Sequence, residues 1–263
     1  MNRDDISRSA IPIEFHRNRT LDDFKKFVTE YRNWIFSYSG EIGGLPPNHY
    51  ITSGVTDAFN QTYALYNKIG IFSGEYGYHK IVLDQRVTHN LEEADVIIIS
   101  HPFSADGNCS HEKIKEADQL GIPIFIDCAY LGICNPNISF DFSEYKNIKS
   151  VAFSLSKTFG TGLYRVGLLF THDKYPCTIY RDWNYDLVAS AEVHYGLLSN
   201  IGPNYMYEKY RTKQEEVCKQ LDLIPSDTII FGVDYTEKYR KKYKRGKVNR
   251  VCISNLIRDE NIK

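Results

Sequence analysis

The sequence predicts an α/β protein: a three-layer α/β/α domain with a mainly parallel sheet, followed by a reduced C-terminal α+β domain. Two observations lead to this fold class. Between residues 51 and 170, short apolar runs alternate with helical segments, which is typical of parallel strands joined by crossover helices. Beyond residue 170 the alternation stops, and helical segments precede two isolated apolar runs. We therefore expect helices on both faces of the main sheet and a small sheet beside it.

The composition is that of a globular protein. Of the 263 residues, 42% are hydrophobic and 25% are charged, close to the usual globular mixture. The 32 basic side chains nearly balance the 33 acidic ones, and this balance argues against a nucleic-acid-binding protein. No apolar run approaches the roughly 18–20 residues needed to span a bilayer, so we expect no membrane-spanning segment.

The N-terminus and the cysteines indicate the compartment. Residues 1–15 include acidic side chains and no long apolar stretch, so they do not resemble a cleaved secretory signal. The six cysteines include no C-x-x-C pair, which argues against both a zinc module and a disulfide scaffold. We expect a cytoplasmic protein with reduced thiols and no bound metal.

The first element is an amphipathic helix. Residues 21–37 carry apolar side chains at steps of three and four, the spacing of a helix that buries one face. The Gly-Gly-Leu-Pro-Pro segment at 43–47 ends this helix, because glycine and proline favour turns. We assign residues 1–48 to an N-terminal arm and helix.

Residues 49–200 form the expected large domain. Helical segments at 57–68 and 111–121 each follow an apolar run, as in repeated strand–helix units. A further long helix is expected around 184–200. The expected strands are residues 51–54, 81–83, 94–100, 122–127, 150–154 and 165–170.

Residues 201–263 form the expected small domain. A helical segment at 205–221 leads to apolar strands at 228–233 and 251–254. Between these strands lies a basic run, residues 240–247. Such a run is usually a solvated hairpin or loop, and contact with an anionic partner or substrate is the alternative that the sequence leaves open.

Chemistry-bearing side chains follow the strands of the large domain. In an open α/β sheet, ligands bind beyond the carboxyl ends of the strands. An acid and a phenol follow the run at 122–126, and two hydroxyls, a lysine and an arginine follow the run at 150–153. The sequence therefore predicts one crevice that contains Asp127, Tyr130, Ser154, Ser156, Lys157 and Arg165.

Four stretches resemble, in order, motifs of the fold-type I pyridoxal-phosphate enzymes, the aspartate aminotransferase-like class I/II family. SLSKTFGTGLYRVG at 154–167 is similar to the lysine signature, and IFIDCAY at 124–130 is similar to the strand that ends in Asp-x-x-Tyr. HPFSADG at 101–107 resembles the Asn-Pro-x-Asn-Pro-Thr-Gly turn, and TSGVTDA at 52–58 resembles the phosphate-binding turn. The resemblance implies a pyridoxal 5′-phosphate cofactor.

The resemblance gives three residues catalytic roles. Lys157 forms a Schiff base with the cofactor aldehyde, for which partial burial and neighbouring cations would lower the pKa of its amine; otherwise it is a surface lysine. Asp127 holds the protonated ring nitrogen, which keeps the ring an electron sink; otherwise it caps a turn. Tyr130 donates a hydrogen bond to the ring oxygen, or is a packed aromatic.

The phosphate and the ring have their own expected ligands. Tyr76 stacks on the ring opposite the small side chain of Ala129, and His79 supports Asp127; both are otherwise turn residues. The phosphate is held by charge-assisted hydrogen bonds and by the first amides of a helix. The expected phosphate ligands are Gly54, Val55, Thr56, Ser154, Ser156 and Arg165.

The chain departs from the family pattern at two asparagine positions and in length. His101 and Ser104 stand where the family turn has asparagines, so the contact to the ring oxygen is expected either to be weaker than that of an amide or to come from Tyr130 alone. Near the C-terminus, Arg250 resembles the family's carboxylate-binding arginine, or is one more cation of the basic run. The arm and the small domain are shorter than is usual in the family.

The function implied by the resemblance is transamination. An amino acid or amino compound would donate its amino group to a keto acid or other carbonyl acceptor, a reaction of amino-acid metabolism or biosynthesis. Decarboxylation or elimination on the same scaffold, and a non-catalytic regulatory protein that binds the cofactor, remain open. The resemblance also implies a homodimer, with each site near the subunit boundary. The sequence does not identify the donor or the acceptor.

Overall fold

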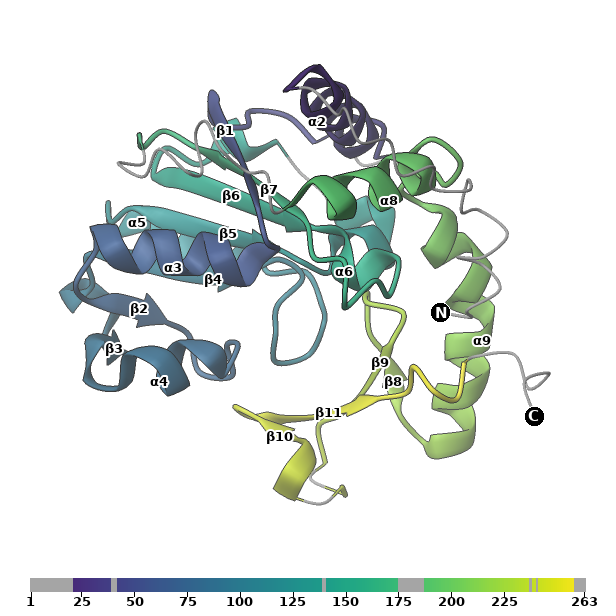
Figure 1. Cartoon of the computed structure of the whole chain (residues 1–263). Helices are drawn as coiled ribbons and strands as arrows, with labels where there is room; N and C mark the ends of the chain where they lie inside the picture. Colours follow the sequence, from purple (N-terminus) through teal and green to yellow (C-terminus); the bar gives the residue numbers. More distant parts are fainter. Residues whose placement is uncertain are drawn as a thin grey trace.

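The computed structural model describes residues 21–38, 42–138, 141–174, 187–236, 238–239 and 241–257. In this part of the chain, seven strands form a large sheet in the order β1-β7-β6-β5-β4-β2-β3, and four form a small sheet in the order β10-β11-β9-β8. Figure 1 shows the large sheet with helices around it and the small sheet at one end of the molecule.

The large sheet is mainly parallel, as the sequence predicts. Pairing is parallel from β3 through β2, β4 and β5 to β6, whereas β7 is antiparallel to both β6 and β1. The strands are β1 (Asn48–Thr52), β2 (Ile69–Ile71), β3 (Val87–Thr88), β4 (Val96–Ser100), β5 (Ile124–Cys128), β6 (Ile148–Ser154) and β7 (Gly167–Thr171).

The helices lie on both faces of this sheet. Figure 1 shows α3 along one face and α2 beside α8. The helices are α2 (Leu21–Phe36), α3 (Val55–Leu65), α4 (Tyr78–Leu83), α5 (His111–Gln119), α6 (Leu155–Thr158), α8 (Val188–Leu198) and α9 (Tyr205–Leu221). No helix of the described segments is both long and apolar enough to cross a bilayer.

Alternate residues of the central strands enter two separate cores. Ile97 and Ile99 belong to the core that also contains side chains of α2, α8 and α9. Ile98 and Phe125 belong to a smaller core with Phe59 of α3. Because successive side chains of a strand point to opposite faces, this division confirms the three-layer arrangement.

One expected strand is wrong. Residues 81–83 belong to the helix α4, in which Ile81 is 84% exposed and Leu83 is buried. A run of three apolar residues does not distinguish the period of a strand from that of a helix. The short strands β2 and β3, which flank α4 in the chain, were not expected.

The small sheet is antiparallel and attaches to the large domain. Its strands are β8 (Ile224–Pro225), β9 (Phe231–Asp234), β10 (Lys244–Arg245) and β11 (Val248–Cys252). The expected strand at 228–233 begins later, because Thr228 and Ile229 donate backbone hydrogen bonds to Gly107 and Ile133 of the large domain. The domain boundary at residue 200 stays a prediction.

Some expectations lie partly or wholly outside the described residues. The helix expected around 184–200 is described from residue 187 and includes α8. Residues 1–20 and Cys177 lie outside the described residues. The five described cysteines are free thiols, as the sequence predicts.

Candidate active site

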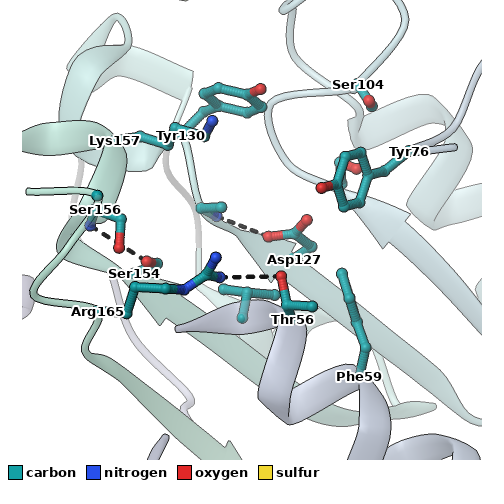
Figure 2. Close-up of a pocket in the computed structure, with 14 residues that line it drawn as sticks. Thr56, Phe59, Tyr76, Ser104, Asp127, Tyr130, Ser154, Ser156, Lys157 and Arg165 are labelled. Carbon is teal, nitrogen blue, oxygen red and sulfur yellow. Dashed lines mark hydrogen bonds between the residues drawn. The ribbon is translucent and has the colours of Figure 1, made fainter. Parts of the chain in front are cut away.

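A cavity of about 200 Å³ lies where β4, β5 and β6 end beside the first turn of α3 (Figure 2). Every site residue named from the sequence lines it except Gly54, His79 and Arg250. The strand ends thus meet at one edge of the sheet, as expected for an open α/β fold. The lining residues are Val55, Thr56, Phe59, Tyr76, Ser100, Ser104, Asp127, Ala129, Tyr130, Ser154, Ser156, Lys157, Gly162 and Arg165.

Gly54 forms the tight turn between β1 and α3. Its φ of 76° lies in the region that favours glycine. A Cβ added there would lie 3.1 Å from a guanidinium nitrogen of Arg165 and 3.4 Å from Ser154 Oγ. The missing side chain therefore lets Arg165 and Ser154 approach the N-terminus of α3 closely.

Hydroxyl groups and one guanidinium group surround this helix end. Arg165 Nη2 donates to Thr56 Oγ1 at 3.1 Å, and Ser154 Oγ accepts from the Ser156 amide at 3.3 Å (Figure 2). Ser156 Oγ is buried and has no hydrogen-bond partner among the described residues. Helix N-termini and arginine forks both bind phosphate groups, so this end of the cavity fits a phosphate monoester.

Asp127 lies at the other end of the cavity. Its side chain is 7% exposed, and one carboxylate oxygen accepts a hydrogen bond from the Ala129 amide at 2.8 Å. Burial raises the pKa of Asp127 to about 7, and the negative charge of Glu75 adds to the rise. A buried carboxyl group of this kind is suited to pair with a cationic N–H donor.

Glu75 is a functional candidate that the sequence reasoning missed. Its carboxylate oxygens accept hydrogen bonds from the Ser100 amide at 2.9 Å, the Tyr76 amide at 2.8 Å and the Ser100 hydroxyl. Ser100 is the β4 residue paired with Asp127 of β5. Glu75 therefore connects the segment that carries Tyr76 to the strand next to Asp127. An acid in a turn usually faces solvent, so the sequence held no signal for this role.

Aromatic side chains form one wall. Tyr76 stacks with Tyr78 at a centroid distance of 6.0 Å and an interplanar angle of 16°. Phe59, which the sequence reasoning also missed, lies against both rings. Ala129 lines the same cavity, so a flat ring has an aromatic and a small side chain available as neighbours.

His79 lies behind this wall. It is fully buried, its Nδ1 shares a hydrogen bond with Tyr63 Oη at 2.6 Å, and its ring packs edge-on against Phe59. Burial lowers the pKa of His79 to about 4, so the imidazole is neutral at pH 7. Its support of Asp127 stays a prediction.

Lys157 projects into the cavity from α6 (Figure 2). Its Nζ lies 5.7 Å from the centroid of the Tyr130 ring. Lys157 is exposed on the short helix α6, so the expected partial burial is wrong. Burial raises the pKa of Tyr130, and the nearby charge of Arg250 opposes that rise.

In the turn after β4, the two residues that depart from the family pattern, His101 and Ser104, have different surroundings. Ser104 lines the cavity, whereas His101 is buried and makes hydrogen bonds to Ser110 Oγ at 2.9 Å and to the Ile138 carbonyl at 2.7 Å. Only Ser104 is therefore available to a ligand in the cavity.

Arg250 lies beside the cavity. Its guanidinium group sits 4.3 Å from the Phe231 ring centroid and donates to the Ser104 carbonyl. The basic run contributes to a β10–β11 hairpin, whose turn packs on Ser73 and Gly74, just before Tyr76 in the chain. The hairpin is confirmed for the described residues, and its contact with an anion stays a prediction.

Comparisons with known proteins find similarity in structure only. No protein-family model and no curated protein matches the chain. Among solved structures, histidinol-phosphate aminotransferase from Clostridium acetobutylicum is 17% identical, with a TM-score of 0.64 over 97% of this chain and 91% of that one. Aspartate aminotransferase from Thermotoga maritima is 10% identical, with a TM-score of 0.67 over 95% and 84%.

The chain has the fold of the fold-type I aminotransferases. A pyridoxal-phosphate-bound C–S lyase from Staphylococcus hominis shares this fold at 12% identity, with a TM-score of 0.60 over 91% of this chain and 71% of that one. The fold-type I fold confirms the α/β class expected from the sequence. Because lyases and aminotransferases share it, the fold does not identify the reaction.

Proposed function

We propose that this protein is a pyridoxal-phosphate-dependent aminotransferase. The observation that carries the proposal is the placement of Lys157, Asp127 and the Arg165–Thr56 pair around one cavity. The amine of Lys157 matches the aldehyde of the cofactor, and the buried acid matches its ring nitrogen. The helix end with Arg165 and Thr56 matches its phosphate. When bound, pyridoxal phosphate supplies an aldehyde that condenses with amines and a ring that withdraws electrons.

The residues of the cavity fit this cofactor. The buried hydroxyl of Ser156 and the guanidinium group of Arg165 would hold the phosphate. Asp127 would accept the ring N–H, and Tyr76 and Ala129 would flank the ring. Tyr130 and Ser104 would bind near the ring oxygen.

Lys157 and Arg250 would act on the substrate. Arg250 would bind the substrate carboxylate, because its guanidinium group lies beside Ser104 and Tyr130 at the cavity. Lys157 Nζ would take the proton from the substrate α-carbon and donate it to the carbon that was the cofactor's aldehyde carbon. Asp127 would remain the counter-charge to the ring nitrogen throughout.

Two other functions use the same residues. A decarboxylase or lyase differs in the substrate bond that is broken. The structural similarity to a C–S lyase supports this alternative. A non-catalytic regulatory protein would bind the cofactor without turnover.

A homodimer forms part of the proposal. Leu163 is 95% exposed next to the lining residue Gly162, and Tyr164 is 44% exposed. Exposed apolar side chains of this kind often mark protein contacts. Light scattering should give the mass of two chains, and an active monomer would contradict this part of the proposal.

Visible absorbance tests the proposed function. Pyridoxal phosphate added to the purified protein should give an absorbance band that Lys157→Ala lacks. Amino donors should remove the band and a keto acid should restore it. A band that no donor changes would favour the regulatory protein, and one-way loss without restoration would favour a lyase or decarboxylase. Absence of any Lys157-dependent band would contradict the whole proposal.

A further inference from the structure

A second cluster of chemistry-bearing side chains lies outside the cavity, on the segment between β4 and α5 (Figure 1). His101, Cys109 and His111 each offer one ligand atom, and these atoms all lie within 4.8 Å of one another. The sequence reasoning missed this group because it searched for cysteine pairs, whereas the cluster combines one cysteine with two histidines.

His101 is oriented as a metal ligand would be. Its Nε2 lies 2.7 Å from the carbonyl oxygen of Ile138, and a carbonyl can only accept, so Nε2 carries the proton. The Nδ1 lone pair then points toward the Ser110 hydroxyl, 2.9 Å away. Metal-bound histidines usually donate their other N–H to a carbonyl or carboxylate in this way. An ion at Nδ1 would replace the hydrogen bonds that Nδ1 accepts from the Ser110 hydroxyl and, at 3.4 Å, from the Ser110 amide.

The two imidazole rings have a suitable separation. Their centroids are 5.2 Å apart. In a tetrahedral site with metal–nitrogen bonds of about 2.1 Å, each centroid lies about 3 Å from the ion, so the centroids are about 5 Å apart. The two ring planes are nearly parallel, at 9°, and a bound ion lies in the plane of each ring that ligates it. The partly buried His111 ring would therefore turn about its side-chain bonds when an ion binds, at an unchanged centroid distance.

The surroundings favour a cation. The Cys109 amide donates to an Asp227 carboxylate oxygen at 2.9 Å, and Glu112 and Asp106 also act electrostatically on the thiol. The negative charge of Glu144 likewise favours a positive charge at His111. Cys109 is exposed, which gives an ion a path from solvent. Two imidazoles and a thiolate select zinc over magnesium or calcium.

We propose that His101, Cys109 and His111 bind a zinc ion, with water as the fourth ligand. Binding releases the thiol proton to solvent, because thiolate is the form of cysteine that binds the metal. The ion would connect the end of β4 to the start of α5. It would thereby brace the turn that carries Ser104, whose carbonyl accepts the Arg250 hydrogen bond.

Cobalt titration of chelator-treated protein tests the site. Cobalt(II) should saturate at one equivalent with a thiolate-to-cobalt absorbance band and the visible bands of a tetrahedral site, and zinc should remove both. Cys109→Ser should abolish the thiolate band, and His111→Ala should weaken binding at least about tenfold. Both altered side chains are at least partly exposed, so the variants should fold, which circular dichroism would verify.

Matched variants distinguish this site from surface binding. Cys252→Ser removes the other exposed described thiol and His172→Ala an exposed imidazole; both should bind cobalt like the unaltered protein. No band, or a band that survives in Cys109→Ser, would overturn the proposal. Equal weak binding by all variants would also overturn it. No pyridoxal phosphate is added, so the outcome is independent of the proposed function.

Discussion

The cavity has a phosphate end, formed by Thr56, Ser154, Ser156 and Arg165, and an acid end, formed by Asp127 with Glu75 nearby. The two ends carry ionisable groups of opposite charge and are built in different ways. At the phosphate end, Arg165 is exposed and donates to the Ser53 carbonyl and to Thr56. At the acid end, Asp127 and Glu75 are both buried. Water and salt screen an exposed cation, whereas burial changes the proton affinity of a carboxyl group. The phosphate end is therefore suited to binding strength, and the acid end to control of protonation.

The difference also concerns how the chain assembles each end. The phosphate end combines two local features, a glycine turn before α3 and a serine cap before α6, with the long-range contact of Arg165 to Thr56. The acid end depends on the pairing of β4 with β5, which places Ser100 beside Asp127, and on Glu75 reaching Ser100 from another segment. A substitution at the acid end is expected to affect both protonation and the contact between segments.

The largest expected effect is on the pH dependence of stability at the acid end. The pKa of Asp127 is raised to about 7 by burial, so between about pH 4 and pH 7 the folded state keeps a proton that the unfolded state releases. Stability from this group therefore falls as pH rises through that window, by on the order of 4 kcal/mol. Urea unfolding of the cofactor-free protein and of Asp127→Asn should give two stability profiles whose difference falls as pH rises through this window.

The unaltered protein must be compared with Asp127→Asn, because other buried groups also make its stability depend on pH. The buried histidines His79, His101 and His194 have lowered pKa values and contribute the opposite slope. Burial raises the pKa of Glu75, which contributes a slope of the same sign as Asp127. Both proteins keep these groups, so the comparison isolates Asp127. Identical pH profiles for the protein and for Asp127→Asn would contradict the prediction.

The second effect is on catalysis. Asp127→Asn should lower kcat about 10²- to 10³-fold, because it removes a preorganised charge opposite the ring nitrogen. Steady-state turnover of the best amino donor measures this loss. Glu92→Gln, an exposed acid outside the cavity, should keep full activity. Turnover of Asp127→Asn within a few-fold of the unaltered enzyme would remove Asp127 from the proposed mechanism.

At the phosphate end, Arg165→Gln should weaken cofactor binding. A hydrogen bond to a charged group contributes about 1.5–3 kcal/mol, which corresponds to a Kd about 10- to 100-fold higher. The loss should shrink at high salt, because the arginine is exposed. Absorbance titration measures Kd, with Arg211→Gln on α9 as the control. An unchanged Kd would show that Arg165 does not contact the phosphate.

The smallest expected effect is that of the Glu75 charge on the pKa of Asp127 at the acid end. Glu75→Gln should lower the pKa of Asp127, because the charge of Glu75 contributes to its rise. Infrared difference spectra of the carboxyl group across pH measure this shift. Ser100→Ala, which keeps the Glu75 charge, should leave the pKa nearer its original value. An unchanged or raised Asp127 pKa in Glu75→Gln would contradict the electrostatic coupling of the two acids.

Several parts of the site were predictable because their signals are local. Asp127 and Ser154 follow strongly apolar runs, so their positions at the ends of β5 and β6 could be inferred from order along the chain. Gly54 and Ser154 show the turn and cap chemistry of helix starts. The exposure of Lys157 was not predictable, because it depends on how far neighbouring segments cover α6.

The α/β class, the strands that contribute to the site and the convergence of Asp127, Lys157 and Arg165 all follow from the order of residues along the chain. The helix at residues 81–83, the burial of Glu75 against Ser100 and the approach of His101 to Cys109 and His111 arise from packing in the folded chain. Periodicity and turn chemistry act over a few residues and can be read along the chain. Burial and contacts between segments depend on packing, which appears only when the chain is folded.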